Sequence, residues 1–592
     1  MSADALHQEA GNSLRYRAGF GRTEITAYEH GMAMLGWEHP EHRVRGVATP
    51  LFARALFVED AEHGGRMVLV VAELGYLTCA IRLGVLAALA ERAKCEPALR
   101  GLGPHNVALS ATHTHSGPSG LSQFPMYNTT NRGFSPPVFD AVVTGIVSAI
   151  AQAVERAEPA TLRYAAARIP YHVPVAFNRS VRAFNDNHDT RPVPAARPEL
   201  ATARESKTLR VDDAAGRGLG LVNWFGLHGT SLHTHLDELH SDNKGIAAVA
   251  VEQRAASAPE QRDDFVAIFA QGAAGDVSPN RRWHRRRGEA IGEHDDDHAS
   301  AELNGALQAE YAWQAFERAA RTTPLGGAVG GRTLHLDMAD APVAARFVGE
   351  RPHPPAPGAQ VRTRGARLGL SMSLGTLEGP GPLHGLRPLF AAIATLRRRA
   401  AKDDPQVPLM EVGHGVRGRA LGLVPYTRLA RLGRFDYSMA YMSAAYAGGV
   451  LGDDPWAPRF LPLQLLSIAG LPVALLPGEP TTTAGRRVRA LLRERLPHAV
   501  DAVVAGHSNG YGGYITTREE YAHQRYEGAS TLFGPHTLGA YLTALDGLAQ
   551  EPVAEDPEAD ALGPPLAPFD HARLVAQREQ ARARIPDALR GS

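Results

Sequence analysis

The part of the sequence that most restricts the fold is the segment between residues 66 and 120. RMVLVVAELGYL (66–77) is a nearly continuous apolar run, which is typical of a strand buried on both faces. IRLGVLAALAERAK (81–94) has helical periodicity and good helix formers, and NVALSATHTHSGPSG (106–120) opens as a second β-prone run. A strand, a helix and a strand in succession predict a parallel strand pair. We therefore expect an α/β protein with a mixed or mostly parallel sheet flanked by helices.

The second of these strands leads into two histidines. If the strand continues through the HTH sequence, its alternating side chains put His113 and His115 on one face, where the chain turns through Gly117 and Pro118. A strand end followed by such a turn is a common place for metal ligands and general bases. An isolated pair of this kind is more often solvated, so its meaning depends on partners from other segments.

Four further strand-like runs lead into polar side chains beside glycine or proline. GLGLVNWFGLHGTS leads to His228, DFVAIFAQGAAGDVSPN to Ser278, and LPVALLPGEP to Glu479. DAVVAGHSNGYGGYITT carries Tyr514, with Tyr526 nearby. Ligands of α/β sheets bind at the carboxyl ends of the strands. We therefore predict that these groups converge on one site at the strand ends.

Composition narrows the chemistry of such a site. Lys+Arg and Asp+Glu both number 62, so the chain has no excess of positive charge for nucleic-acid binding. The only cysteines are Cys79 and Cys95, which excludes a disulfide framework and a cysteine-based metal site. A bound metal ion therefore needs nitrogen and oxygen ligands, and two imidazoles with one carboxylate form the commonest catalytic zinc triad. These residue types indicate a hydrolase with one Zn²⁺.

The length and the terminal segments indicate how the chain is organised. We expect one catalytic domain over residues 1–550, with a polar peripheral insertion at about 281–365, and then a proline-rich acidic linker and a basic helix at 551–592. The first residues show no basic segment followed by an apolar one, so the expected location is cytoplasmic for the chain as written, or secreted if its N-terminus has been trimmed. The apolar stretch 460–477 is broken by prolines and a glycine, which predicts two buried strands and a turn rather than a membrane span.

Five motifs, taken in order, resemble one known family. ATHTHSGP, NWFGLHGTS with SDNKG downstream, GDVSPN, GEPTTTAGRR and YITTREEYAHQRYEGASTLFGPHT together are similar to the neutral ceramidases, over roughly residues 15 to 550. The resemblance implies the catalytic domain of that family without its C-terminal immunoglobulin-like domain. It also implies that His113, His228, Glu479 and Tyr514 hold the zinc ion, and that His115, Arg179, Ser278 and Tyr526 line the reacting carbonyl.

The activity implied by the resemblance is hydrolysis of the N-acyl amide bond of ceramide or a related N-acyl lipid by a zinc-activated water. Ser278 is an alternative nucleophile if His115 reaches its hydroxyl as a base. The same site also suits an acyltransferase or another amide-forming enzyme, and a non-catalytic lipid-binding protein ranks below both. The sequence predicts no nucleic-acid partner and leaves the oligomeric state open.

Three further features have competing interpretations. Glu73, at the end of an apolar run, either orients a ligand histidine or forms a structural ion pair with an arginine. The segment HGTSLHTHLDELHSDN is either a second metal site or a solvated loop. RRWHRRR (281–287) is either a solvated face or the point of a peripheral contact with an anionic lipid surface.

Overall fold

The core of the fold is a large mixed β-sheet. A computed structural model describes residues 15–37, 39, 41–349, 358, 360–381, 383–400, 404–412, 419–420, 424–425, 440–441, 456–554 and 556–584. Its eight-stranded sheet runs in the order β13 (Gln261–Gln271), β11 (Gly218–Phe225), β10 (Glu205–Asp213), β8 (Glu158–Arg168), β1 (Tyr16–Glu24), β4 (Phe52–Asp60), β5 (Arg66–Ala72) and β6 (Val107–Ala111). Within this sheet β5–β6 and β11–β13 are parallel and the other neighbours are antiparallel. The α/β class and the mixed sheet are confirmed, but the sheet is not mostly parallel.

The strand-helix-strand unit predicted at the start of the chain is present. Strands β5 and β6 are parallel neighbours, joined through α2 (Cys79–Arg92). This helix begins two residues before the predicted range because the hydroxyl of Thr78 accepts a hydrogen bond from the backbone N–H of Ile81 and caps its first turn. Strand β6 ends at Ala111, before either histidine.

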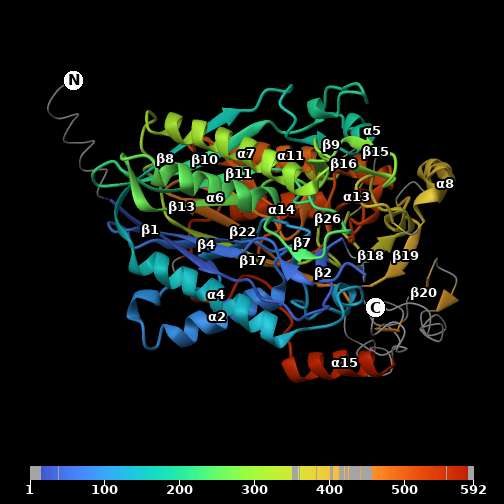
Figure 1. The fold of residues 1–592 in the computed structure, drawn as a ribbon, viewed down its shortest axis with the longest axis horizontal. Helices are drawn as coiled ribbons and strands as arrows, with labels where there is room; N and C mark the ends of the chain where they lie inside the picture. The colour runs from blue at the N-terminus through green and yellow to red at the C-terminus, as the bar shows by residue number, and fades with distance from the viewer. Residues whose placement is uncertain are drawn as a thin grey trace.

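Each face of the large sheet packs against a different layer. Helices α2, α4 (Pro136–Glu155), α6 (Asp242–Ala256) and α7 (Asp297–Ala319) cover one face, over side chains such as Phe57 and Ala267. The opposite face, with Leu56 and Ile268, packs against Val473 of a four-stranded sheet. That sheet has the order β17 (Gly330–Asp337), β22 (Phe460–Ile468), β23 (Leu471–Leu475) and β25 (Val503–Ala505), and α11 (Thr482–Arg495) and α14 (Thr537–Leu548) cover its outer side. The two halves of the large sheet pack against each other, with Phe20 of β1 in contact with Gly220 of β11, so α6 and α7 appear above it and α2 and α4 below it in Figure 1.

Short elements complete the described part of the chain. They are β2 (Met34–Gly36), β3 (Gly46–Val47), β7 (Ser116–Pro118), β9 (Phe177–Asn178), β12 (Glu238–Leu239), β14 (Val277–Ser278), β15 (Arg282–His284), β16 (Glu289–Ile291), β18 (Arg367–Gly369), β19 (Pro408–Glu411), β20 (Arg419–Ala420), β21 (Val424–Pro425), β24 (Glu479–Pro480), β26 (Tyr514–Ile515), α3 (Pro125–Asn128), α5 (Val181–Asn185), α8 (Arg387–Ala400), α12 (Arg518–Ala522), α13 (Tyr526–Ala529), α15 (His571–Arg584), and the 3₁₀ turns η1 (Pro97–Leu99), η2 (Pro198–Ala201), η3 (Ala345–Phe347), η4 (Leu370–Leu374) and η5 (His384–Leu386).

Helix α7 lies inside the range 281–365 that the sequence assigns to a peripheral insertion. In the structure it packs against α6 and the large sheet, and the Thr208 hydroxyl of β10 donates to the Ala312 carbonyl of this helix at 3.3 Å. Its apolar side chains therefore belong to the main core rather than to a separate lobe. The division of the chain at residue 550 stays a prediction.

Two apolar segments differ in how they relate to a membrane span. Residues 460–477 form the antiparallel pair β22–β23, as the sequence predicts. Helix α4 has the length and hydropathy of a bilayer-crossing helix, and 67% of its most apolar window is buried inside the protein. Burial against the large sheet accounts for this apolar composition, which core helices share with membrane spans.

The start of α11 provides a test of local capping. The buried hydroxyl of Thr481 accepts a hydrogen bond from the backbone N–H of Ala484 at 3.3 Å and donates to Glu520 at 2.6 Å. We expect Thr481→Ala to lower the free energy of unfolding by about 1–2 kcal/mol, because the helix loses its cap and a buried carboxylate loses a donor. Urea denaturation checks this, with Thr481→Ser, which keeps the hydroxyl, as the control. Equal stability of the two variants would contradict it.

Candidate metal centre

Two histidines approach each other because the turns that follow β6 and β11 are in contact. His113 lies two residues after β6 in the left-handed region of the backbone, with φ 69°. The next residue, Thr114, bridges to Gly229, and the His115 N–H donates to the Gly229 carbonyl at 2.9 Å. A Cβ at position 229 would lie 2.3 Å from the His113 carbonyl oxygen, so only glycine permits this approach. The glycine of the GLHGTS motif therefore places His228 beside His113.

Glu479 and Tyr514 arrive on a second pair of segments. They face each other in the short parallel pair β24–β26, which follows β23 and β25 of the smaller sheet. A Cβ at Gly275, in the GAAGDVSP turn, would lie 2.6 Å from the Glu479 carbonyl oxygen. Close backbone packing of this turn therefore brings the smaller sheet's carboxylate to the strand ends of the large sheet.

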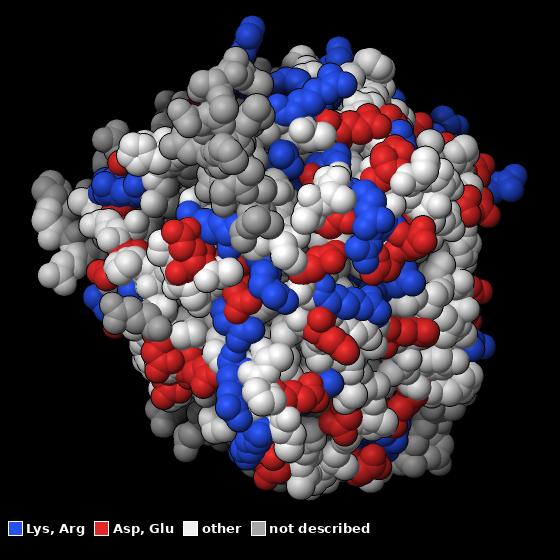
Figure 2. Space-filling model, turned by 90° about the vertical axis from the view of Figure 1, so that its left-hand side faces the viewer, with Lys and Arg blue, Asp and Glu red and all other residues white. Residues whose placement is uncertain are grey.

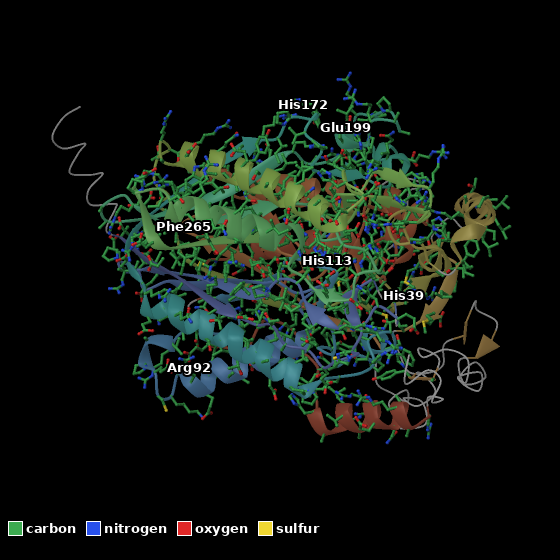
Figure 3. The ribbon with its side chains drawn as sticks, viewed as in Figure 1. His39, Arg92, His113, His172, Glu199 and Phe265 are labelled. Carbon is green, nitrogen blue, oxygen red and sulfur yellow. The ribbon has the colours of Figure 1, made fainter. Side chains whose placement is uncertain are left out.

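The ligand atoms of the four groups lie close to one another. The Nε2 atoms of His113 and His228 lie 3.5 Å and 3.2 Å from Oε2 of Glu479, and the Tyr514 hydroxyl lies 3.4 Å from Nε2 of His228. Figure 3 shows His113 deep within the protein. The structure therefore brings the four predicted ligands together, and their role as ligands stays a prediction.

Hydrogen bonds to backbone carbonyls make Nε2 the unprotonated nitrogen of both rings. The Nδ1–H of His113 donates to the Gly75 carbonyl at 2.5 Å, and that of His228 donates to the Ala274 carbonyl at 2.7 Å. Such bonds fix the tautomer of a metal-binding histidine and orient its ring. Oε2 of Glu479 is buried without a hydrogen-bond partner. Because buried polar atoms are otherwise almost always paired, this donor set fits a cation.

The protonation states of Glu479 and His228 also favour binding of a cation. Burial by itself raises the pKa of Glu479, but the neighbouring His113 and His228 outweigh it, so this pKa lies well below its usual value. Burial, and then the positive charge of Arg179, lower the pKa of His228. At neutral pH the site thus offers a carboxylate and a neutral imidazole. Burial raises the pKa of Tyr514 well above 10, and Glu479 adds to this while Arg179 opposes it.

The four residues predicted to face the reacting carbonyl surround these ligands. His115 places its Nε2 3.2 Å from Nε2 of His113. Arg179, whose side chain is 9% exposed, donates to the Tyr514 hydroxyl at 2.9 Å. Its guanidinium carbon lies 5.6 Å from the ring centre of Tyr526, which stands edge-on to Tyr514. The Ser278 hydroxyl donates to Glu378, another partner of Arg179.

Sequence reasoning missed several residues of this centre. His507 stacks on His113 with ring centres 3.9 Å apart, and both of its ring nitrogens are buried without a hydrogen-bond partner. It follows β25 in AGHSNG, the same strand-end pattern that identified His228, so this signal was present. Glu378 and Glu527 each accept a 2.8 Å hydrogen bond from Arg179. They follow no strand, and no local pattern marks them.

The features with competing interpretations are now distinguished by their contacts. Glu73 is buried against Arg54 in a structural ion pair and touches none of the candidate ligands in the hydrogen bonds described. His233 is buried, with one ring nitrogen 2.9 Å from Asp297 and the other 3.0 Å from the Ala290 carbonyl. Neither nitrogen is free for a metal ion. Among the described residues, the close groupings of ligand-type side chains all include His113.

Comparison with known proteins identifies the family. The family model described as neutral/alkaline non-lysosomal ceramidase, N-terminal, matches residues 16–387 and 445–543. The chain belongs to the neutral/alkaline non-lysosomal ceramidase family. The neutral ceramidase of Pseudomonas aeruginosa is 32% identical over 90% of this chain and 71% of its own length. That of Mycobacterium tuberculosis is 29% identical over 90% of this chain and 76% of its own length.

Solved ceramidase structures have the same fold. A ceramidase complexed with C2 superposes with a TM-score of 0.71 at 30% identity, covering 92% of this chain and 77% of its own. The crystal structure of the neutral ceramidase from Pseudomonas aeruginosa gives a TM-score of 0.69 at 28% identity, covering 90% and 74%. Family membership makes the chain an amide hydrolase. Helix α8 begins at the last residue of the first matched range and ends before the second.

Proposed function

We propose that this protein is a zinc-dependent amidase that hydrolyses the N-acyl amide bond of ceramide or a closely related N-acyl lipid. The observation that carries the proposal is the convergence of two Nε2 atoms on the unpaired Oε2 of Glu479, deep in the protein and beside a tyrosine hydroxyl. The names of the most similar relatives supply the substrate class.

The residues present fit a divalent cation. His113, His228, Glu479 and Tyr514 would hold it, because their nitrogen and oxygen atoms lie within 3.2–3.5 Å of a neighbour in the set and are typical zinc donors. The chemistry that zinc supplies in such a site is Lewis acidity, which polarises an amide carbonyl and lowers the pKa of water towards neutrality.

Three side chains position the substrate and its developing charge. The guanidinium of Arg179 is held by Glu378 and Glu527, which fixes its orientation toward Tyr514. Burial lowers the pKa of His115 well below its usual value, so its imidazole is neutral and free to donate a hydrogen bond to an oxyanion. The ring of Tyr526 lies next to the Arg179 guanidinium, so its hydroxyl is the third group assigned to the substrate carbonyl.

Two observations favour water over Ser278 as the nucleophile. The Ser278 hydroxyl donates to Glu378 and to the Asn280 carbonyl, and no hydrogen bond joins it to His115 among the described residues. Glu378 is a weak base, because Arg179 and His228 outweigh the effect of burial and lower its pKa. A hydroxyl held by a weak base is poorly activated for attack.

The test combines metal analysis with hydrolysis of a panel of N-acyl amides. We expect the wild type to bind one zinc ion per chain and to release free fatty acid from ceramide, and His228→Ala to lose the metal and the activity. His172→Ala, at an exposed histidine on the periphery, is the control (Figure 3). Full activity of His228→Ala, or a wild type without zinc, would refute the mechanism.

Adding an amine acceptor to the same assay distinguishes hydrolysis from acyl transfer. We expect free fatty acid to remain the main product, because the proposed nucleophile is water. A predominance of the new acyl amine would favour the alternative amide-forming enzyme.

A further inference from the structure

Large apolar side chains are exposed together in one region of the structure. Leu377, Leu386, Leu389 and Leu396 are 44%, 46%, 56% and 66% exposed, and Trp283 is 49% exposed. We call these five residues the rim surface. Four of them fall within twenty residues of sequence. Scattered exposed leucines are ordinary on soluble proteins, but a cluster of this kind marks an interaction site.

The exposed leucines of helix α8 share one face. Leu389, Ile393 and Leu396 are spaced i, i+4 and i+7, so their side chains lie on one side of the helix. Phe390 lies about 100° further round the helix than Leu389 and is buried, 8% exposed, so this residue anchors the helix to the protein. A surface helix normally turns its apolar stripe toward the core. Here a second apolar stripe faces outward, which is the pattern of a helix that lies in a membrane interface.

The rim surface adjoins the candidate metal centre. Leu377 precedes Glu378, which holds Arg179 and Ser278. The Leu377 carbonyl accepts a hydrogen bond from the N–H of Ala290 at 2.7 Å, which joins this segment to the hairpin that carries Trp283. Figure 1 shows α8 and β15 at the same end of the molecule. An apolar surface at this position is next to the groups proposed to bind an N-acyl lipid.

The charges around Trp283 complement an anionic surface. Arg285 and Arg286, at the tip of the β15–β16 hairpin, are exposed, and no carboxylate of the described residues forms an ion pair with either. The other arginines of this segment, Arg281, Arg282 and Arg287, pair with Glu293, Asp295 and Asp297, so Arg285 and Arg286 carry its unpaired positive charge. At the end of the molecule opposite α8, Figure 2 shows Lys and Arg interspersed with Asp and Glu. Arginines beside exposed leucines and a tryptophan suit a bilayer with acidic headgroups, which attracts the cations and accepts the apolar side chains.

We propose that the rim surface docks the protein onto a lipid bilayer that contains anionic lipid, at the side of the candidate centre. This proposal rests on the proposed function, because it takes the bilayer as the source from which an N-acyl lipid reaches the candidate metal centre. Docking there brings Glu378 and Arg179 close to the membrane in which an N-acyl lipid resides.

Vesicle binding tests the rim surface without using catalysis. Wild-type protein is mixed with phosphatidylcholine vesicles, with and without phosphatidylglycerol, and the bound fraction is measured by sedimentation. We expect binding to the anionic vesicles, and a loss of about tenfold or more in partition for the double variant Leu389→Glu with Leu396→Glu. Val500→Glu is the matched control, because Val500 is 58% exposed and lies outside the rim surface. It should bind like the wild type.

A water-soluble short-chain N-acyl amide separates docking from chemistry. The double variant should hydrolyse it at the wild-type rate, which also shows that the variant is folded. Equal vesicle binding by the wild type, the double variant and Val500→Glu would overturn the proposed docking role of the rim surface, and so would a wild type that binds no vesicles. A wild-type dimer that the double variant converts to a monomer would overturn it too, by assigning these leucines to a contact between copies. Vesicle binding without hydrolysis of any amide would instead count against the proposed function.

Discussion

Replacing His113 and His115 separately is expected to give two different losses. His113→Ala removes an Nε2 that lies 3.5 Å from Oε2 of Glu479, so the variant should lose bound zinc, and its hydrolysis rate should fall by about 10³-fold or more. His115→Ala should keep one zinc ion per chain and lose about 10²–10³-fold in rate, as removal of a single oxyanion donor does. Metal content after dialysis and kcat on an N-acyl amide measure the two effects.

The physical reason for this division lies in the hydrogen bonds of the two rings. The Nδ1–H of His113 donates to the Gly75 carbonyl, which leaves its Nε2 as an acceptor and fits it for a cation. His115 has no such backbone partner, and its Nδ1 is buried without one. If His115→Ala lost the metal as fully as His113→Ala, the proposed separation of roles would be wrong.

The second large effect is expected on stability, at Arg54. This buried guanidinium, 3% exposed, pairs with Glu73 and lies 2.9 Å from Glu252, so it joins β4 and β5 to helix α6. Arg54→Met leaves Glu73 buried without its countercharge, whereas Glu252 keeps a partner in Arg22 at 2.6 Å. We expect the free energy of unfolding to fall by about 3–5 kcal/mol. Chemical denaturation followed by circular dichroism measures it.

The pH dependence of this variant follows from the same carboxyl group. Burial already raises the pKa of Glu73 in the native protein, with Arg54 opposing the rise. Without Arg54 the folded-state pKa rises further above its unfolded value, so the native state binds a proton that the unfolded state does not. Stability is then lost as the pH rises from the unfolded-state pKa of Glu73 through its folded-state pKa. The free energy of unfolding of Arg54→Met should therefore be lower at pH 8 than at pH 5.

An exposed ion pair provides the control. Arg92 pairs with Glu96 at 2.6 Å on the periphery of the molecule (Figure 3), and the two side chains are 37% and 44% exposed. Arg92→Met should cost less than about 1 kcal/mol. Similar losses for Arg54→Met and Arg92→Met would show that burial of the Arg54 pair carries no special weight.

Local patterns predicted the elements that carry the site, and one geometrical detail was wrong. The sequence placed His113 and His115 on one face of a strand, but β6 ends at Ala111 and His113 has a positive φ. The two rings nevertheless meet, because the turn brings them together. The prediction that both histidines lie at the edge of the sheet was right. Their rings meet because of the turn, and not because side chains alternate along a strand.

The sequence by itself determined the β5–α2–β6 unit, the strand ends that carry His113, His228 and Glu479, and the exclusion of cysteine ligands. Each depends on periodicity, turn residues or composition within a short stretch of chain. Tertiary structure alone decided that a second sheet packs on the first, and that Glu378 and Glu527 hold Arg179. Arg179 is separated in sequence from Glu527 by 348 residues and from Glu378 by 199. Contacts of that separation depend on how the packed layers bring the segments together, and no local pattern in a single sequence encodes them.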